Sequence, residues 1–245
     1  GKLVIGTWNT LASTSVTKVI SSVGLDFQIV DLEHGPFIMS EIHDHVSSSN
    51  HFGCATIIRI PTNSDWMILQ SLDQGANGIM VSKIETRENA QKFIDYSHYY
   101  PIGKRGFSPY TLAGNYENKK GYTERANESI IKIIILESRI ALENIEEILE
   151  LNNIDIVYIG AFDLSVDLGI GGDVYNKKNV DLISHAIKKI NSSGKIAGSF
   201  VPHNLDQVNF CIDLGIKFIT YSLDSHKLKN SYQEDIEKIK KINVK

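Results

Sequence analysis

The sequence predicts an α/β fold, a TIM (β/α)8 barrel that occupies residues 1–245 as a single domain. Short runs rich in β-branched residues alternate with amphipathic segments eight times along the chain, and eight βα units in about 250 residues are typical of this barrel. The short runs are almost continuously apolar, as expected of parallel strands that are covered on both faces.

The predicted strands are 3–8, 27–32, 55–60, 78–82, 131–136, 155–160, 195–200 and 217–222. The predicted helices are 13–23, 38–51, 64–75, 86–98, 141–151, 176–193, 204–214 and 225–243. Helix-start residues such as Asn63 and Ser64 precede several of them. A doubly wound open sheet is the alternative. It is disfavoured because the first strand and the turn after it contain only Gly6, instead of the glycine-rich turn of a dinucleotide-binding fold.

Two segments point to surfaces with a function. Residues 99–126 mix Gly, Pro, Tyr and charged residues without a regular pattern, and a loop this long in a compact domain is more often a lid or an interface than a linker. In the C-terminal helix, apolar residues recur every three or four positions and predict one apolar face. These residues are Leu228, Tyr232, Ile236, Ile239 and Ile242. The face packs either on its own barrel or on a neighbouring subunit.

Composition and charge disfavour several classes of protein. The chain has 25 Lys and Arg against 29 Asp and Glu, a net charge of −4, so it lacks the basic surplus of a nucleic-acid-binding protein. No apolar run approaches the roughly 18 residues of a membrane span, and no secretory signal pattern is present. The two cysteines, Cys54 and Cys211, lie far apart in apolar contexts, which favours reduced thiols in a cytoplasmic protein.

Polar side chains at the ends of predicted strands mark a candidate active site. Asp31 and His34 follow the second strand, Arg59 ends the third, Glu137 follows the fifth and Asp163 follows the sixth. TIM-barrel active sites lie at the C-terminal ends of the strands, so these side chains are expected at one edge of the barrel. The two carboxylates after neighbouring strands suit a hard divalent cation, Mg²⁺ first and Mn²⁺ or Co²⁺ as substitutes.

Each of these side chains has a chemical and a structural interpretation. His34 is a candidate general base with Asp31 as its local partner, and Arg59 is a candidate for holding an oxyanion or a carboxylate. The structural alternatives are an ion pair between Glu137 and its neighbour Arg139, and a helix-capping role for the aspartate after the sixth strand.

Motifs along nearly the whole chain resemble the HpcH/HpaI aldolase family of class II, metal-dependent pyruvate aldolases. In order, from about residue 3 to about residue 228, they are GTWNTLAS, DFQIVDLEHGP, IIRIPTNSDW, LDQGANGIMV, YPIGKRGFSP, ILES with ALENIEEIL, and VYIGAFDLSVDLG. The resemblance implies a barrel of the phosphoenolpyruvate/pyruvate type and reversible cleavage of a 4-hydroxy-2-oxo acid, of the 2-keto-3-deoxy sugar acid type, to pyruvate and an aldehyde through a metal-bound enolate. It also implies a homo-oligomer, commonly a hexamer assembled as a trimer of dimers that exchange C-terminal helices.

Carried over to this sequence, the resemblance makes His34 the general base, Asp31 its partner and Asp73 a second aspartate that raises its basicity, either within the subunit or from across a subunit interface. It makes Arg59 the group that stabilises the developing enolate. The metal ligands that it implies are Glu137 and Asp163. The other substrate-side residues that it implies are Trp8, Gly160, Ala161 and Phe162. Lys83, which the family pattern does not supply, is a further candidate for contact with an anionic or polyhydroxylated aldehyde.

Three departures from the family pattern bear on the substrate. Ile135 stands where the family usually has Gln, Ala161 stands where it has Pro in GPxD, and VSKI replaces VPxV and brings Lys83 to the edge of the barrel. The alternatives to a pyruvate aldolase are a citrate-lyase-β-like enzyme acting on an acyl-CoA, and a protein that binds pyruvate or a metal without turnover.

Overall fold

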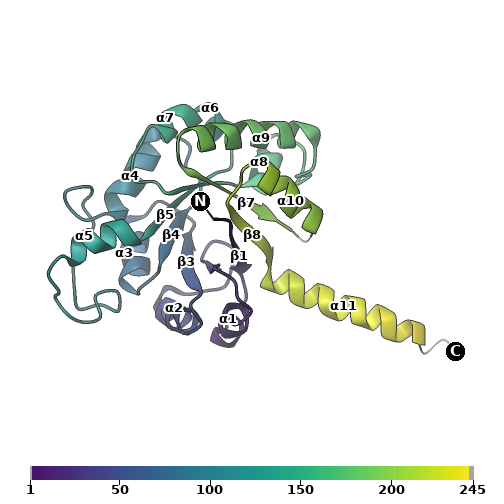
Figure 1. Cartoon of the computed structure of the whole chain (residues 1–245), viewed down its shortest axis with the longest axis horizontal. Helices are drawn as coiled ribbons and strands as arrows, with labels where there is room; N and C mark the ends of the chain where they lie inside the picture. Colours follow the sequence, from purple (N-terminus) through teal and green to yellow (C-terminus); the bar gives the residue numbers. More distant parts are fainter. Residues whose placement is uncertain (1, 203, 243–245) are drawn as a thin grey trace.

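The computed structural model describes residues 2–202 and 204–242 and shows a closed barrel of eight parallel strands (Figure 1). The strands are β1 (Val4–Asn9), β2 (Phe27–Asp31), β3 (Ala55–Ile60), β4 (Gly78–Val81), β5 (Ile131–Leu136), β6 (Ile156–Ile159), β7 (Ile196–Val201) and β8 (Phe218–Leu223). Each strand pairs with the next one in sequence, and β8 pairs with β1 to close the barrel. The predicted TIM barrel and its eight strands are therefore confirmed.

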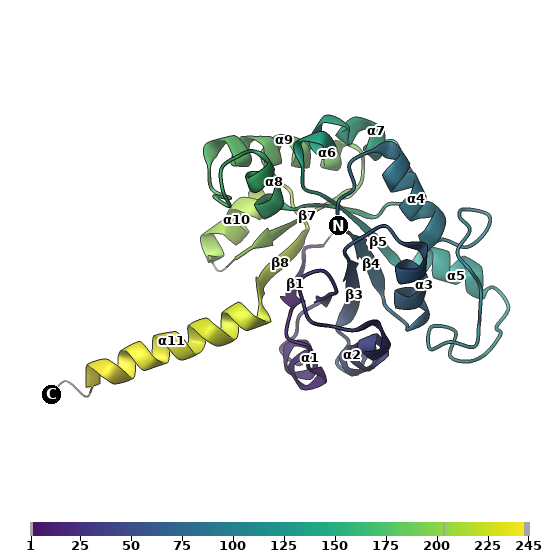
Figure 2. The same cartoon turned by 180° about the vertical axis from the view of Figure 1, so that it is seen from behind.

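Most of the helices lie around the barrel, as seen from both sides in Figures 1 and 2. They are α1 (Thr14–Ser21), the 3₁₀ helix η1 (Met39–Glu41), α2 (Ile42–Asn50), α3 (Asp65–Asp73), α4 (Arg87–Ser97), α5 (Tyr122–Ser129), α6 (Arg139–Glu143), α7 (Ile145–Leu149), α8 (Ala161–Asp167), α9 (Lys177–Ser192), α10 (Leu205–Asp213) and α11 (Asp224–Ile242). Within the described residues, none of these helices combines the length and apolar character needed to cross a membrane.

Apolar side chains fill both sides of the strands, which explains their continuously apolar sequences. One cluster lies between the strands and the helices, and a second fills the barrel interior with Ile57, Met80 and Ile133 among others. At the start of β1, a Cβ on Gly6 would lie 2.4 Å from the ring of Phe27. This position therefore needs glycine, because any side chain would collide with the interior packing.

The helices between β4 and β7 differ in part from the predictions. The irregular segment predicted over 99–126 ends earlier, because α5 begins at Tyr122. Two short helices, α6 and α7, replace the single helix predicted over 141–151. The short helix α8 is not among the predicted helices, although a capping role for Asp163 implied a helix that begins just after this aspartate. It begins at Ala161 with Gly160 as its N-cap residue, so the suggestion that Asp163 caps this helix is wrong.

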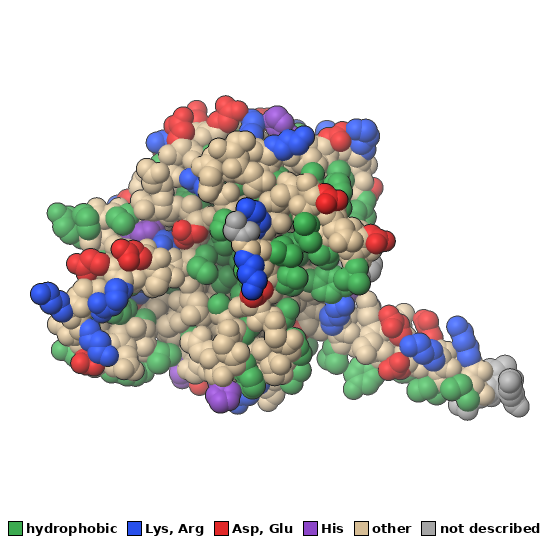
Figure 3. Space-filling model, in the orientation of Figure 1, with side chains coloured by type: hydrophobic (Ala, Val, Ile, Leu, Met, Phe, Trp, Pro, Cys, Tyr) green, Lys and Arg blue, Asp and Glu red, His purple; other side chains and the backbone are tan. Residues whose placement is uncertain are grey.

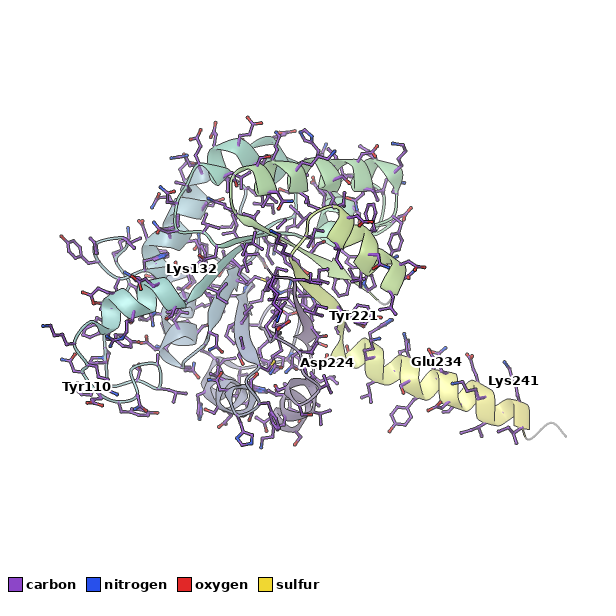
Figure 4. All side chains as sticks on the ribbon, viewed as in Figure 1. Tyr110, Lys132, Tyr221, Asp224, Glu234 and Lys241 are labelled. Atoms are coloured by element: carbon purple, nitrogen blue, oxygen red, sulfur yellow. The ribbon has the colours of Figure 1, made fainter. Side chains whose placement is uncertain are left out.

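Helix α11 extends away from the barrel instead of packing along it (Figures 1 and 4). Asp224, labelled in Figure 4 at the barrel end of this helix, is its only buried residue. The Asp224 carboxylate accepts hydrogen bonds from the backbone N–H groups of Thr10 and Leu11, the latter at 2.8 Å. The loop after β1 therefore fixes the start of α11, while the rest of the helix projects outward.

Candidate active site

A cavity of about 300 Å³ opens at the C-terminal ends of the strands. It brings together most of the residues predicted for the site, namely Trp8, Asp31, His34, Arg59, Glu137, Gly160, Ala161, Phe162 and Asp163. The other lining residues are Thr10, Ile135, Tyr158, Ile159, Phe200 and Leu223. Among the residues that the structure describes, Asp73 and Lys83 are the two predicted site residues that do not line this cavity.

Arg59 is held by a carboxylate and an aromatic ring. Its Nε donates to Asp31 Oδ1 at 2.7 Å, and its Nη2 donates to Asp31 Oδ2, so the two side chains form a bidentate pair. The guanidinium carbon lies 4.3 Å from the ring centroid of Trp8. Both members of the ion pair are nearly buried, where charge-assisted bonds are strong and directional. Arg59 therefore has a fixed orientation at the edge of the cavity.

Asp31 also shapes the turn that presents His34. Its Oδ1 accepts the backbone N–H groups of Glu33 at 3.0 Å and of His34 at 3.3 Å. The His34 imidazole lines the cavity and is exposed to solvent. Asp31 thus contacts the backbone of His34 and the guanidinium of Arg59, and through these contacts it positions both side chains.

Asp73 lies at the C-terminal end of α3, away from the cavity. Its Oδ1 accepts a hydrogen bond from Arg105 Nη2 at 2.6 Å, and the Arg105 guanidinium lies 4.6 Å from the ring centroid of Tyr99. Within one chain, Asp73 therefore has a partner of its own outside the cavity. A role for it beside His34 stays a prediction that requires a second subunit.

Glu137 and Asp163 form the acidic part of the cavity. Burial, the nearby Asp163 carboxylate and Glu33 together raise the pKa of Glu137 to about 7. The Glu137 Oε1 atom accepts the backbone N–H of Lys83 at 2.9 Å. On the other side, a Cβ on Gly160 would lie 2.8 Å from Oε2, so the glycine leaves room for this carboxylate. The alternative ion pair between Glu137 and Arg139 is wrong, because Arg139 pairs with Asp167.

These two carboxylates fit a divalent cation. The structure brings no group of three or more His, Cys, Asp or Glu ligands together within residues 2–202 and 204–242, but Mg²⁺ is commonly held by one or two carboxylates together with water and substrate oxygens. A cation would also offset the like-charge repulsion and the burial that raise the pKa of Glu137. Both the donor set and its electrostatics therefore suit a hard divalent metal.

The floor of the cavity is a hydrogen-bonded aromatic group. Trp8 Nε1 donates to Thr220 Oγ1 at 3.0 Å, and the Tyr158 hydroxyl bonds to the same oxygen. Burial raises the pKa of Tyr158, which keeps this hydroxyl protonated. Ile135, in the position of the family's usual Gln, adds an apolar wall. The floor holds Trp8 in place beneath the Arg59 guanidinium.

Two residues at or beside this site, Tyr158 and Glu33, were not predicted from the sequence. Tyr158 could have been found from the period-two pattern of strands, since it shares a face with Ile156 and both point into the barrel. Glu33 lies between Asp31 and His34, but nothing in the sequence indicates that its side chain contacts Arg59, 3.4 Å away.

Comparisons with known proteins agree with this arrangement. The model of the HpcH/HpaI aldolase/citrate lyase family matches residues 4–231. A hydroxypyruvate/pyruvate aldolase of Roseobacter denitrificans is 30% identical over 233 residues, which cover 94% of this chain and 90% of the relative. A 2-keto-3-deoxy-L-rhamnonate aldolase of Klebsiella pneumoniae is 30% identical over 226 residues, which cover 92% of this chain and 84% of the relative.

Solved structures agree as well. The crystal structure of an HpcH/HpaI aldolase from Desulfitobacterium hafniense has a TM-score of 0.93 and 26% sequence identity, covering 98% of this chain and 93% of that one. The resemblance seen in the sequence motifs is therefore confirmed over most of the chain. This chain is an aldolase-type carbon–carbon lyase and belongs to the HpcH/HpaI aldolase/citrate lyase family.

Proposed function

We propose that this lyase reversibly cleaves a 4-hydroxy-2-oxo acid, of the 2-keto-3-deoxy sugar acid type, to pyruvate and an aldehyde. The observation that carries the proposal is the convergence of three carboxylates, one guanidinium and one imidazole in a single cavity at the C-terminal edge of the barrel. The names of the two relatives above, one for pyruvate and one for a 2-keto-3-deoxy acid, support the same class of substrate.

We propose Glu137 and Asp163 as the ligands of the metal, with Mg²⁺ preferred and Mn²⁺ or Co²⁺ as substitutes. A divalent cation held there supplies a Lewis acid that stabilises negative charge developing on a 2-oxo acid. The Lys83 amide on Glu137 Oε1 orients that carboxylate. Hydrogen bonds of this kind commonly tune metal affinity.

His34 and Arg59 have separate roles toward the substrate. In the synthetic direction, His34 accepts a proton from the methyl carbon of pyruvate, and the guanidinium of Arg59 stabilises the oxygen on which negative charge develops. The new carbon nucleophile attacks the aldehyde carbon, and the resulting alkoxide takes up a proton. Cleavage runs through the same steps in reverse. No step uses a lysine as a nucleophile, and the Lys83 ammonium lies 3.3 Å from the Glu33 carboxylate.

We further propose a homo-oligomer in which α11 packs on a second copy of the chain. The apolar residues Leu228, Tyr232 and Ile236 on α11 are exposed, and hydrophobic side chains follow one edge of this helix in Figure 3. Val19 on α1 and Leu205 on α10 are also exposed, at 66% and 70%. The exposed apolar side chains of α11 suit burial against a second copy when helices are exchanged, as in the hexamer assembled from dimers that the resemblance implies. Buried, unpaired Cys54 and Cys211 suit the reducing cytoplasm that we propose for it.

Deuterium exchange into the methyl group of pyruvate tests the proposed chemistry without any choice of aldehyde. The protein is incubated with pyruvate and Mg²⁺ or Mn²⁺ in D₂O, and the methyl signal is followed by NMR. We expect exchange that stops with EDTA and falls strongly in His34→Ala, whereas Lys83→Ala retains it at saturating metal, because the backbone amide remains. Metal-independent exchange with a borohydride-trapped adduct on Lys83 would falsify the metal mechanism. No exchange with any divalent metal would favour the acyl-CoA or binding alternatives.

The assembly has a separate test. Light scattering of the intact chain should give the mass of an oligomer, and replacing Leu228 and Ile236 together by Ser should shift it toward a smaller species. A monomeric wild-type chain at micromolar concentration would contradict the proposed exchange of α11.

A further inference from the structure

Glu33 is a nearly buried acid that contacts three residues around the site but does not line the cavity. Its side chain is 9% exposed. Its Oε2 accepts a hydrogen bond from Ser82 Oγ at 2.6 Å and lies 3.4 Å from Arg59 Nη1, and its Oε1 lies 3.3 Å from Lys83 Nζ. The described residues that line the cavity do not include it, so its effect on the substrate must be indirect.

The second residue after β4, Lys83, adopts a backbone conformation that needs support. Lys83 has φ of 60°, in the left-handed region that non-glycine residues rarely occupy. In this conformation its backbone N–H points to Glu137 Oε1 at 2.9 Å. A strained backbone persists only where its surroundings hold it. Here the side chains of Ser82 and Lys83 both contact the same Glu33 carboxylate.

We propose that Glu33 is a positioning residue that acts through this turn. By holding the Ser82 hydroxyl and the Lys83 ammonium, it keeps the Lys83 amide on Glu137 and so fixes the orientation of a metal ligand. Its second oxygen restrains the Nη1 end of Arg59 at the same time. One buried carboxylate thereby connects the acidic pair and the guanidinium. The inference rests on the proposed function, since it assigns Glu137 to the metal.

The Ser82 hydroxyl is one of the two side-chain contacts that join this turn to the Glu33 carboxylate. Ser82 is 2% exposed, so its hydroxyl requires a partner inside the protein. The Glu33 carboxylate supplies that partner and anchors the turn.

Binding of Mn²⁺ in the absence of pyruvate, followed by the EPR signal of the free ion, tests this role without turnover. We expect Glu33→Ala to weaken Mn²⁺ binding about 10- to 100-fold, the usual effect of removing a group that orients a metal ligand. Ser82→Ala, which removes one of the three contacts, should weaken it about threefold to tenfold in the same measurement. This milder variant also provides the test if Glu33→Ala does not fold.

The pair of variants Lys83→Gly and Glu33→Ala with Lys83→Gly distinguishes positioning from charge. Glycine adopts φ of 60° without strain and keeps the amide that contacts Glu137, so in this background Glu33→Ala should change Mn²⁺ affinity less than about threefold. Both variants of the pair lack the Lys83 ammonium, so if Glu33 acted through its charge alone, Glu33→Ala would weaken binding here by at least the factor seen with Lys83 present. Asp95→Ala is the matched control, because Asp95 also contacts one lysine, Lys104, and one neutral donor, Gln91, but lies outside the site.

Three results decide the inference. Weak binding by Glu33→Ala, together with nearly equal binding by Lys83→Gly and the double variant, supports it. Wild-type Mn²⁺ affinity in both folded Glu33→Ala and Ser82→Ala, or the same loss from Glu33→Ala in the Lys83→Gly background as in the wild type, overturns it while leaving the proposed function intact. A wild-type protein that neither binds Mn²⁺ nor exchanges the pyruvate methyl group overturns the proposed function itself, and the inference with it.

Discussion

The two sides of the active-site cavity differ in chemistry and in exposure. The charged side, from the ends of β2, β3 and β5, consists of Asp31, Arg59 and Glu137, with Glu33 behind them. The apolar side, from the ends of β6, β7 and β8, consists of Phe162, Phe200 and Leu223. On the charged side these four side chains are at most about one-tenth exposed, whereas Phe162 is 45% exposed. Asp163, on α8, lies where the two sides meet.

This difference separates the two halves of the proposed reaction. Buried charges that are paired with one another have little freedom, because an unpaired buried charge is costly, so the charged side presents one fixed geometry to the keto acid. Apolar contacts are non-directional, so the apolar side can accept substituents of different shapes. We infer that the charged side activates pyruvate and that the apolar side borders the aldehyde.

The largest effect is expected when the acidic pair is broken. Glu137→Gln keeps the size of the side chain but removes a proposed metal ligand and its charge. We expect pyruvate methyl exchange to fall at least about 10³-fold, since a metal ion contributes several kcal/mol to stabilising the developing charge. NMR exchange and Mn²⁺ titration measure the loss. Asp181→Asn, which removes a surface ion pair with Lys177, is the control, and wild-type exchange in Glu137→Gln would contradict the assignment.

Arg59→Lys weakens the charged side without removing its positive charge. A lysine cannot form the bidentate pair with Asp31 or stack on Trp8 in the same way, so we expect kcat for methyl exchange to fall about 10²- to 10³-fold, as when an oxyanion donor is lost. The matched control is Arg139→Lys, in an exposed pair with Asp167. Equal kinetics for the two variants would show that the fixed guanidinium is not needed.

The pH dependence of metal binding tests whether burial on the charged side raises the pKa of Glu137. Because the pKa of Glu137 is raised to about 7, metal must displace a proton below that pH. The apparent dissociation constant of Mn²⁺ should therefore rise about tenfold for each pH unit below 7 and level off above it. Isothermal titration from pH 5.5 to 8.5 measures this. A level affinity down to pH 5 would mean that Glu137 titrates as an exposed carboxylate does.

The strands and the candidate site residues at their ends could be predicted from the sequence, because both depend on the local pattern of apolar and polar residues. Continuously apolar runs identified all eight strands, and the rule that barrel strands end at the active site brought His34, Arg59, Glu137 and Asp163 together in advance. Helix α8 was missed because it has only seven residues and directly follows β6, which leaves no room for a periodic apolar signal.

The partners of the charged side chains could not be predicted, because they depend on contacts between strands. Asp31 pairs with Arg59, which is directly opposite it in the register of β2 and β3, although sequence proximity suggested His34. No sequence motif indicates a role for Glu33. Its contacts are with Ser82 and Lys83, which follow β4 and lie far from it in sequence. Such contacts become visible only when the register of the barrel is known.

The smallest effect is expected on the apolar side. Phe162 lies immediately before Asp163, and its ring is 5.9 Å from that of Phe200, centroid to centroid. Phe162→Ala removes an apolar surface at the place where we expect the aldehyde. For an aromatic aldehyde, kcat/KM should fall about tenfold, the usual effect of a lost apolar contact. For a small hydroxylated aldehyde the fall should be less than about threefold, because there is less apolar surface to lose.

The two sides can be distinguished by measuring, for each variant, whether methyl exchange or addition to the aldehyde slows more. If the apolar side borders the aldehyde, Phe162→Ala must reduce the addition to an aromatic aldehyde more than it reduces methyl exchange, which involves no aldehyde. Arg59→Lys must show the opposite order, since it acts before the aldehyde is attacked. Equal losses in both measurements for Phe162→Ala would mean that this ring shapes the whole cavity, and the division into a donor side and an acceptor side would have to be abandoned.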